Sequence, residues 1–239
     1  MTAAWLRVTA LTHRGAIRTG NEDSLVVGGF TACGVDLADP VTLMLPMRDP
    51  VVVAVADGMG GHEAGEMASA HAVRSLAATS PKDAAQVEVV LRRIDDDLTS
   101  ACRDSPGLCG LGTTIAGVLI GSQEGHCFTV GDSRVYAEHG GYLAQLSVDD
   151  RGPTGGLTQS LGGRSDGSAL WPRLAELPAG SRLLLCSDGL SDLVNADTIE
   201  KLLATSDEPA RTVRALWVAA MNASGRDNIT IVLVEPDND

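Results

Sequence analysis

Aromatic residues are scarce in this 239-residue chain, where phenylalanine, tryptophan and tyrosine together make up 3%. This scarcity argues against a platform of stacked rings for single-stranded nucleic acid. Basic residues are outnumbered, 18 against 31 acidic ones, and the formal net charge of −13 argues against non-specific binding to DNA or to an anionic membrane. Hydrophobic residues make up 44% of the chain, enough for a sizeable core, which argues against disorder.

The chain also lacks any apolar run near the roughly 20 residues that a membrane-spanning helix needs. Its first residues contain no stretch apolar enough for a secretory signal. The five cysteines are odd in number and form no Cys-x-x-Cys pair, which predicts reduced thiols without a zinc knuckle or a disulfide framework. We therefore expect a cytoplasmic protein that forms one domain over residues 1–239. Nothing in the sequence demands a dimer, and a monomer is expected.

The predicted strands and helices are grouped along the chain and do not alternate strictly. Short segments rich in β-branched residues predict strands at 24–28, 51–56, 113–120, 126–130, 134–138, 143–146, 182–187 and 229–234. Apolar residues at helical spacing predict helices at 63–78, 83–103, 197–203 and 208–222. The proline-containing segment 31–50 is expected to be a surface loop or a hairpin between two strands. The grouping favours an α+β layered sandwich over a doubly wound parallel sheet.

Acidic residues lie at the turns beside these strands. Asp57, Asp132 and Asp188 each come directly after a predicted strand or one residue later, whereas Glu22-Asp23 and Asp227 lie just before one. In a mostly antiparallel sheet the end of one strand lies beside the start of its neighbour, so all five sites can gather at one edge. We therefore expect a cluster of carboxylates there.

Carboxylates that lie close together repel one another, and a bound cation removes that repulsion. Ligation by oxygen alone points to Mg²⁺ or Mn²⁺ rather than zinc. Two such ions would orient a water, lower its pKa and offset the charge of a phosphate. Each Asp-Gly or Asp-Asn pair taken alone is more often ordinary turn chemistry. The inference of a metal site therefore depends on the pattern across the whole chain.

Six short motifs follow one another in a recognisable order. They are RTGNED (18–23), ADGMGGH (56–62), GTT (112–114), GDSR (131–134), SDGL (187–190) and GRDNIT (225–230). Each motif is weak alone, but together they resemble the bacterial form of the metal-dependent protein phosphatase family, also called PPM or protein phosphatase 2C. The resemblance extends from about residue 9 to the last predicted strand.

The resemblance implies a four-layer α-β-β-α sandwich around a central antiparallel β-sandwich. It also implies hydrolysis of phosphoserine and phosphothreonine in proteins, with two Mn²⁺ or Mg²⁺ ions that activate a water and without a covalent phosphoenzyme. Asp57 would bridge the two ions, and the backbone carbonyl of Gly58 would bind the second. Asp188 and Asp227 would complete the ligands of the first ion. The expected substrates are the phosphoproteins of a cognate serine/threonine kinase.

The resemblance also implies roles for residues around these metal ligands. Glu22 and Asp23 would hold waters bound to the ions, and Arg18 would clamp the phosphate, since its fork suits bidentate capture of phosphate oxygens. Asp132, together with the ligand Asp188, resembles a weaker third metal site.

The proton donor to the leaving group has two candidates, His62 and a metal-bound water. His62 would act as a general acid, but a role at the start of the helix beginning near residue 63 is slightly favoured for it.

The chain departs from the family in one region. Members usually carry a flap subdomain after the strand that ends near Leu146, yet here 146–150 runs almost straight into 158–162 through a short glycine-rich stretch, 152–156. The flap is therefore predicted to be largely absent and the site more open. Members of the family usually have a histidine after the aspartate at the start of this connection. Here Asp149 is followed by Asp150 instead.

Other functions were weighed against the phosphatase. The alternative is a catalytically weak signalling or binding module on the same fold, for which the missing flap is the only argument. A phosphatase with an aspartyl nucleophile would need Asp-x-Asp-Gly-Thr after the first strand, and a nucleotide hydrolase would need Gly-x-x-x-x-Gly-Lys-Ser/Thr. Neither pattern is present at those places.

Overall fold

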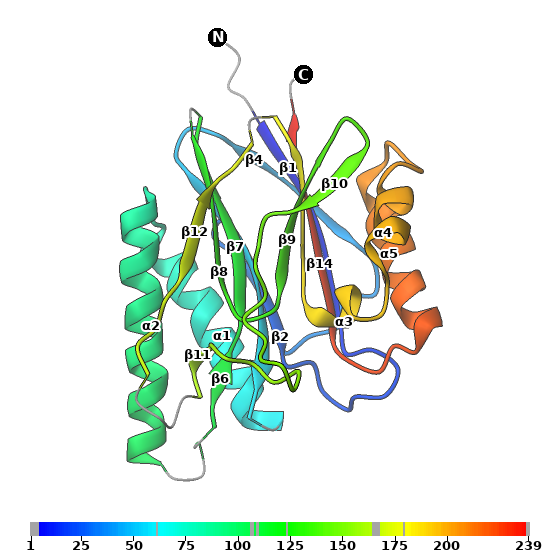
Figure 1. Ribbon diagram of the computed structural model, residues 1–239. Coiled ribbons are helices and arrows are strands. Elements are labelled where there is room, and N and C mark those ends of the chain that lie inside the picture. The colour runs from blue at the N-terminus through cyan, green and yellow to red at the C-terminus, as the bar shows by residue number, and fades with distance from the viewer. Residues whose placement is uncertain are drawn as a thin grey trace.

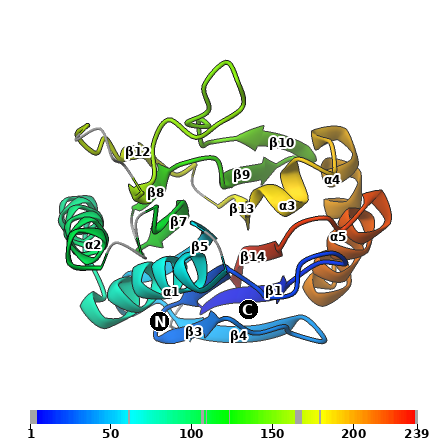
Figure 2. The ribbon, with the colours of Figure 1, turned by 90° about the horizontal axis from the view of Figure 1, so that it is seen from below.

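Four layers make up the fold in the computed structural model (Figures 1 and 2). The structure describes residues 5–60, 62–105, 108, 110–122, 124–163, 168–178 and 180–237. Two antiparallel sheets pack face to face, and helices cover the outer face of each. The predicted fold class, an α-β-β-α sandwich, is therefore confirmed.

One sheet has six strands and contains both ends of the described chain. Its order is β10 (Tyr142–Gln145), β9 (Arg134–His139), β13 (Arg182–Cys186), β14 (Ile229–Asp237), β1 (Trp5–His13) and β4 (Val41–Pro46). Strands β1 and β14 pair along their whole length, from Trp5 opposite Asp237 to His13 opposite Ile229. This pairing places the segments before β2 and before β14 at the same end of the sandwich.

The other sheet has eight strands. Its main path runs through β11 (Leu161–Gly162), β6 (Gly112–Thr113), β5 (Val51–Met59), β7 (Ile115–Ile120), β8 (Gly125–Val130) and β12 (Arg173–Glu176). Strand β2 (Asp23–Val27) pairs with β5 and with β3 (Phe30–Cys33). The register of β2 on β5 places Asp23 directly opposite Asp57.

Five helices form the outer layers. Helices α1 (His62–Thr79) and α2 (Ala84–Asp104) cover the eight-stranded sheet, and α3 (Asp188–Ser191), α4 (Ala196–Leu203) and α5 (Pro209–Ala223) cover the six-stranded one. The side chain of Asp83 accepts a hydrogen bond from the backbone N–H of Gln86 and so caps the start of α2. None of the helices in the described ranges is long and apolar enough to cross a membrane.

Strands β5 and β13 are apolar at consecutive positions because each separates two cores. Val51, Val53 and Val55 of β5 pack between the two sheets. The alternate residues Val52, Ala54 and Ala56 pack against α1 and α2. On β13, alternate residues likewise face the central core and the core beneath α4 and α5. Such strands are covered on both faces, which is what a continuous apolar run indicates.

The segment 31–50 is neither the surface loop nor the hairpin that we expect from the sequence. Strand β3 ends in the eight-stranded sheet, and the chain then crosses to β4, which pairs with β1 at the edge of the six-stranded sheet. Side chains of β4 alternate between half-buried and exposed, and Leu43 and Leu45 pack against the central core. Its last residue, Pro46, is tolerated because an edge strand needs hydrogen bonds on one side only.

The connection from β10 to β11 is a tight loop in which every residue is described. Arg151 and Leu157 form an isolated bridge, and the N–H of Gly152 donates to the carbonyl of Gly156 at 2.8 Å. Residues 147–160 contain no helix. The loss of a flap relative to other members of the family stays a prediction.

The two phenylalanines of the chain offer a matched test of the core. Phe128 on β8 is fully buried in the core beneath α1 and α2, whereas Phe30 on β3 is 37% exposed. We expect Phe128→Ala to lower the free energy of unfolding by about 3–5 kcal/mol, because the ring leaves a cavity. Phe30→Ala should cost about 0.5 kcal/mol or less. Urea unfolding followed by tryptophan fluorescence measures both, and equal losses would contradict this account of the core.

Candidate active site

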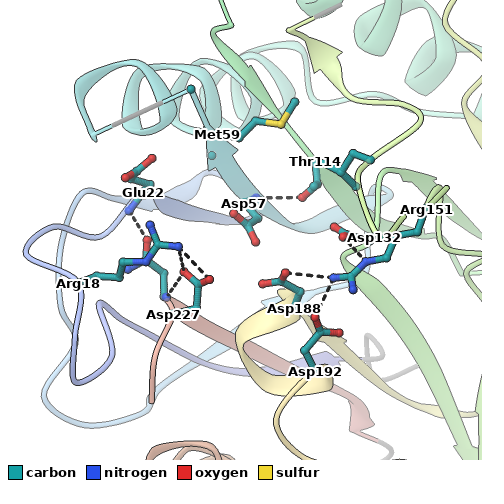
Figure 3. Close-up of a pocket in the computed structure, with 15 residues that line it drawn as sticks. Arg18, Glu22, Asp57, Met59, Thr114, Asp132, Arg151, Asp188, Asp192 and Asp227 are labelled. Carbon is teal, nitrogen blue, oxygen red and sulfur yellow. Dashed lines mark hydrogen bonds and ion pairs between the residues drawn. The ribbon is translucent and has the colours of Figure 1, made fainter. Parts of the chain in front are cut away.

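A cavity of about 560 Å³ opens at one end of the central sandwich (Figure 3). Its lining carries six carboxylates and two guanidinium groups, which belong to Glu22, Asp57, Asp132, Asp188, Asp192, Asp227, Arg18 and Arg151. The structure thus brings together seven predicted site residues from five separate segments, Arg18, Glu22, Asp57, Gly58, Asp132, Asp188 and Asp227. Asp23 lies behind the cavity.

The backbone of Asp57 is held by the Gly112-Thr113-Thr114 motif. The N–H of Asp57 donates to the hydroxyl of Thr114 at 3.0 Å. Its carbonyl accepts from the hydroxyl of Thr113 and from the N–H of Thr114, both at 2.9 Å. These three bonds tie the end of β5 to the start of β7, which fixes the direction in which the Asp57 side chain leaves the strand.

Two glycines next to cavity aspartates are required by close backbone packing. A Cβ atom on Gly58 would collide with the carbonyl of Gly65 in α1, and one on Gly189 would collide with the carbonyl of Asn228. Neither glycine has a positive φ. The Asp-Gly pairs at these positions therefore serve the approach of one backbone to another, and ordinary turn chemistry does not explain them.

Burial and mutual repulsion raise the pKa values of the clustered carboxyl groups. The pKa of Asp57 lies well above its ordinary value of 3.8, because the group is buried and four aspartates face it. Burial, together with Asp132 and Asp227, raises the pKa of Asp188 to about 6. The fold therefore gathers more negative charge here than its own basic groups neutralise.

Asp23 is fully buried and only half satisfied. Its Oδ2 accepts hydrogen bonds from the hydroxyls of Ser187 at 2.8 Å and Thr230 at 2.7 Å. Its Oδ1 has no hydrogen-bond partner in the described structure. Burial raises the pKa of Asp23 to about 7. A buried carboxylate oxygen without a hydrogen-bond partner lowers the stability of the fold. This oxygen is therefore a strong hydrogen-bond acceptor for a group that binds nearby.

Arg18 and Glu22 line the other side of the cavity. The guanidinium of Arg18 contacts both carboxylate oxygens of Asp227, at 2.9 and 3.0 Å, and the Arg18 side chain remains 43% exposed. The N–H of Glu22 donates to the side-chain carbonyl of Asn228 at 2.8 Å. Asn228 also donates to the carbonyls of Arg14 and Gly20. Asn228 therefore fastens the loop that carries Arg18 to the start of β14.

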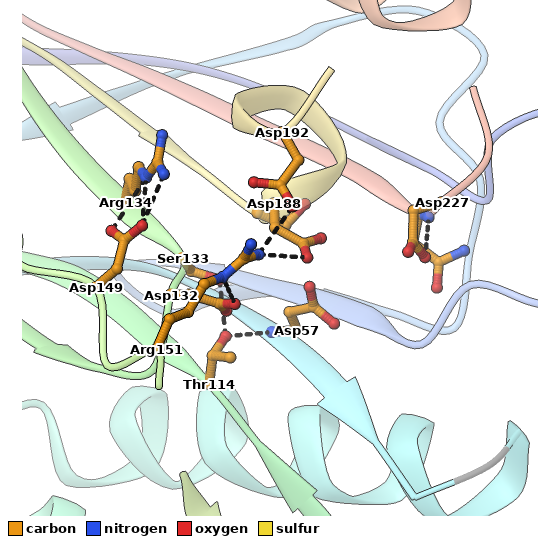
Figure 4. Close-up of polar contacts among 12 residues, drawn as sticks. Asp57, Thr114, Asp132, Ser133, Arg134, Asp149, Arg151, Asp188, Asp192 and Asp227 are labelled. Atoms are coloured by element: carbon orange, nitrogen blue, oxygen red, sulfur yellow. Dashed lines mark hydrogen bonds and ion pairs between the residues drawn. The ribbon is translucent and has the colours of Figure 1, made fainter. Parts of the chain in front are cut away.

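Arg151 and Asp192 are site residues that sequence reasoning missed. The guanidinium of Arg151 contacts Asp132 at 2.6 Å, Asp188 at 3.2 Å and Asp192 at 2.9 Å (Figure 4). Asp192 follows Asp188 by one helical turn, a spacing that could have indicated it. Arg151 lies in a loop without a motif, and its partners are 19 to 41 residues away.

Asp150, at the position of the usual histidine, is a buried structural anchor. Its carboxylate accepts hydrogen bonds from the N–H of Gly131 at 3.1 Å and from the guanidinium of Arg173 at 2.8 Å. Its own N–H donates to the carbonyl of Gly131 at 2.9 Å. Asp150 therefore holds the turn that presents Asp132.

The described residues include no group of three or more His, Cys, Asp or Glu side chains placed to hold a metal ion by themselves. The two arginines contact four of the aspartates in their present positions. Helix α1 begins at His62, but the side chain of His62 lies outside the described residues. Its role as general acid or at the helix start stays a prediction.

Comparison with known proteins gives one consistent result. The family described as protein phosphatase 2C matches residues 43–225. The serine/threonine protein phosphatase PstP of Mycobacterium tuberculosis (strain H37Rv) is 31% identical over 96% of this chain. The chain spans only 45% of that relative's length. The serine/threonine phosphatase stp of Listeria monocytogenes serovar 1/2a is 29% identical over 95% of this chain and 94% of its own.

Solved structures agree with the sequence relatives. The catalytic domain of PstP in complex with two manganese ions has a TM-score of 0.77 at 30% identity, covering 98% of this chain and all of that one. A serine/threonine phosphatase of S. agalactiae has a TM-score of 0.80 at 24% identity, covering 97% of this chain and all of that one, and shows the likeness of fold alone. Since the family match covers most of the chain and includes four of the cavity aspartates, this protein belongs to the protein phosphatase 2C family.

Proposed function

We propose that this protein is a metal-dependent protein serine/threonine phosphatase. It would hydrolyse phosphoserine and phosphothreonine in proteins without a covalent phosphoenzyme. The observation that carries the proposal is one cavity in which six carboxylates and two guanidiniums meet on the fold of this family. Relatives that match nearly the whole chain are named serine/threonine phosphatases, and one is solved with two manganese ions.

The residues present fit two divalent cations. Every candidate donor in the cavity is an oxygen atom, as Mn²⁺ and Mg²⁺ prefer. Six carboxylates and two guanidiniums leave four net negative charges when ionised, which two divalent ions neutralise. The Oδ1 of Asp23, buried and without a partner, supplies a further acceptor behind the cavity. When bound, two such ions supply an activated water and offset the charge of the phosphate.

The proposed ligands follow from the resemblance and from the positions of the side chains. Asp57 lies between Asp227 and Asp188 in Figure 3, which supports a bridging role for it. Asp188 and Asp227 would complete the ligands of the first ion, and the carbonyl of Gly58 would bind the second. Because the described residues include no group of three or more His, Cys, Asp or Glu side chains already placed around an ion, waters held by Glu22 and Asp23 would complete the coordination.

Arg18 would bind the phosphate of the substrate. Its guanidinium lines the cavity beside Asp227, and part of the side chain remains exposed. A guanidinium can hold two phosphate oxygens at once, which orients the phosphorus for attack. The Asp227 carboxylate holds Arg18 in place before substrate arrives.

The domain organisation, location and oligomeric state are proposed from the composition. We infer a single catalytic domain over residues 1–239 that acts in the cytoplasm as a monomer. Its substrates would be phosphoproteins made by a serine/threonine kinase. The net charge of −13 is consistent with a protein partner and unfavourable for nucleic acid or an anionic membrane.

The direct test is hydrolysis of a phosphothreonine peptide with and without Mn²⁺. We expect turnover to require Mn²⁺ and to fall about 100-fold or more in Asp57→Asn, because the bridge between the two ions is weakened. Asp97→Asn, on the exposed face of α2, is the matched control and should stay within about twofold of wild type.

Activity of Asp57→Asn within a few-fold of wild type would refute the bridging role. Binding of Mn²⁺ by the wild type without any turnover would instead support the alternative function, a signalling or binding module on the same fold.

Loss of the phosphate clamp should act mainly on substrate binding. We expect Arg18→Ala to raise KM about 10-fold or more with a smaller change in kcat, because a charge-assisted contact to the phosphate is removed. Arg14→Ala is a matched control, since Arg14 lies on the same loop but pairs with Asp36. Steady-state kinetics on the same peptide decides the point, and an unchanged KM for Arg18→Ala would place the clamp elsewhere.

Stability should depend on pH and on Mn²⁺ together. Without metal, Asp188 and Asp23 keep their protons up to about pH 6 and 7 in the folded state, against about 3.8 in the unfolded state. Between these limits the folded protein binds more protons than the unfolded chain, so its free energy of unfolding falls as pH rises. Mn²⁺ offsets that loss by binding the ionised carboxylates. Its stabilising effect should therefore be larger at about pH 7.5 than at about pH 5.

Thermal unfolding with a chelator and with excess Mn²⁺, at both pH values, measures this effect. A Tm increase of the same size at both pH values would show that the clustered carboxyl groups do not bind the ion.

A further inference from the structure

Arg151 lies between three carboxylates of the cavity. Its Nε is 2.6 Å from Oδ2 of Asp132, and its Nη2 is 3.2 Å from Oδ2 of Asp188 and 2.9 Å from Oδ2 of Asp192. Asp132 belongs to the turn between β8 and β9, whereas Asp188 and Asp192 belong to α3 and its end. One guanidinium therefore joins the turn that connects the two sheets to the helix that follows β13 (Figure 4).

The backbone on both sides of Arg151 is anchored. Asp149 accepts three hydrogen bonds from the guanidinium of Arg134, at 2.7 to 3.0 Å. Asp150 is buried and holds Gly131 through backbone and side chain. Arg151 itself pairs with Leu157 across the loop. The fold thus places this side chain on the cavity wall, where only 27% of it is exposed.

The same two aspartates are the ones that the resemblance assigned to a weak third metal ion. A Mn²⁺ or Mg²⁺ ion binds carboxylate oxygens at about 2.0–2.2 Å. An ion on the oxygens that Arg151 contacts would lie roughly 4 Å from the guanidinium, where two positive charges in a partly buried site repel strongly. With Arg151 in this position, Asp132 and Asp188 do not fit a third ion.

The charge of the cavity leads to the same result. Two divalent ions already neutralise the four net negative charges of the six carboxylates and two guanidiniums. A third ion would give the empty cavity two net positive charges. Without Arg151, the same cavity with two ions would keep one negative charge, centred on Asp132 and Asp188, and would attract a further cation.

We propose that the guanidinium of Arg151 is a built-in cation that takes the place of a third metal ion between Asp132 and Asp188. The inference rests on the proposed two-ion phosphatase. A guanidinium keeps its charge at every physiological pH and cannot dissociate from the protein. The positive charge at this position is therefore independent of the Mn²⁺ concentration, and Mn²⁺ binding saturates at two ions per chain.

The test counts bound Mn²⁺ per chain, from the electron paramagnetic resonance signal of the free ion, up to low-millimolar concentration. We expect two ions on the wild type. Arg151→Gln should bind a third ion at higher concentration, because the carboxylates of Asp132 and Asp188 are released. Arg151→Lys keeps a positive charge at this place and should stay at two.

Two further variants locate the effect. Arg18→Gln removes the same charge from the same cavity but from beside Asp227, so it should stay at two ions. Adding Asp132→Asn to Arg151→Gln should remove the third ion again, because one of its two ligands is lost. Circular dichroism melting curves establish that each variant is folded.

Three ions on the wild type, or two on a folded Arg151→Gln variant, would overturn the inference while leaving the phosphatase proposal intact. A wild type that binds no Mn²⁺ would instead refute the proposed two-ion function. If Arg151→Gln does not fold, the number of Mn²⁺ ions bound by the wild type and by Arg151→Lys still shows whether a third ion binds beside a positive charge at residue 151.

Discussion

Repulsion among six carboxylates in one cavity is the constraint that the rest of the site must satisfy. Burial makes the repulsion worse, because it removes the water that would screen the charges. The pKa of Asp57 is raised by its burial and by four surrounding aspartates, which shows how far the fold departs from a neutral arrangement. A protein gains nothing in stability from such a cluster, so its presence is best explained by the cations and the phosphate that it can bind.

The fold concentrates these charges without distorting its core. Five of the six carboxylates lie at or near the end of a strand, and Asp192 lies at the end of α3, so the strands behind the cavity can remain apolar, as β5 and β13 are. How closely the segments that carry the carboxylates approach one another then depends on uncharged residues. Gly58 and Gly189 let backbones pass closely, and Thr113 and Thr114 fasten the backbone of Asp57. The precision of the site therefore belongs to the scaffold as much as to the acidic side chains.

Much of this arrangement could be predicted, because strand ends and antiparallel pairing are local signals. The gathering of Asp57, Asp188 and Asp227 follows from their places at strand ends. Other features have no local signal. Strand β1 carries buried polar residues, and its Thr12 finds partners in Thr230 of the neighbouring strand, at 2.7 Å, and in Asn21, at 2.9 Å. Helix α3 has four residues, which is too short for a helical period to show.

The role of Arg151 was hidden for the same reason, since its partners lie far away in the sequence. Its position in the chain nevertheless groups it with two other charged residues. Three consecutive residues, Asp149, Asp150 and Arg151, each make a buried or partly buried ionic contact. Asp150 fixes the turn that presents Asp132, and the next residue neutralises that same aspartate. Holding and neutralising Asp132 are thus two tasks of one short, rigid loop.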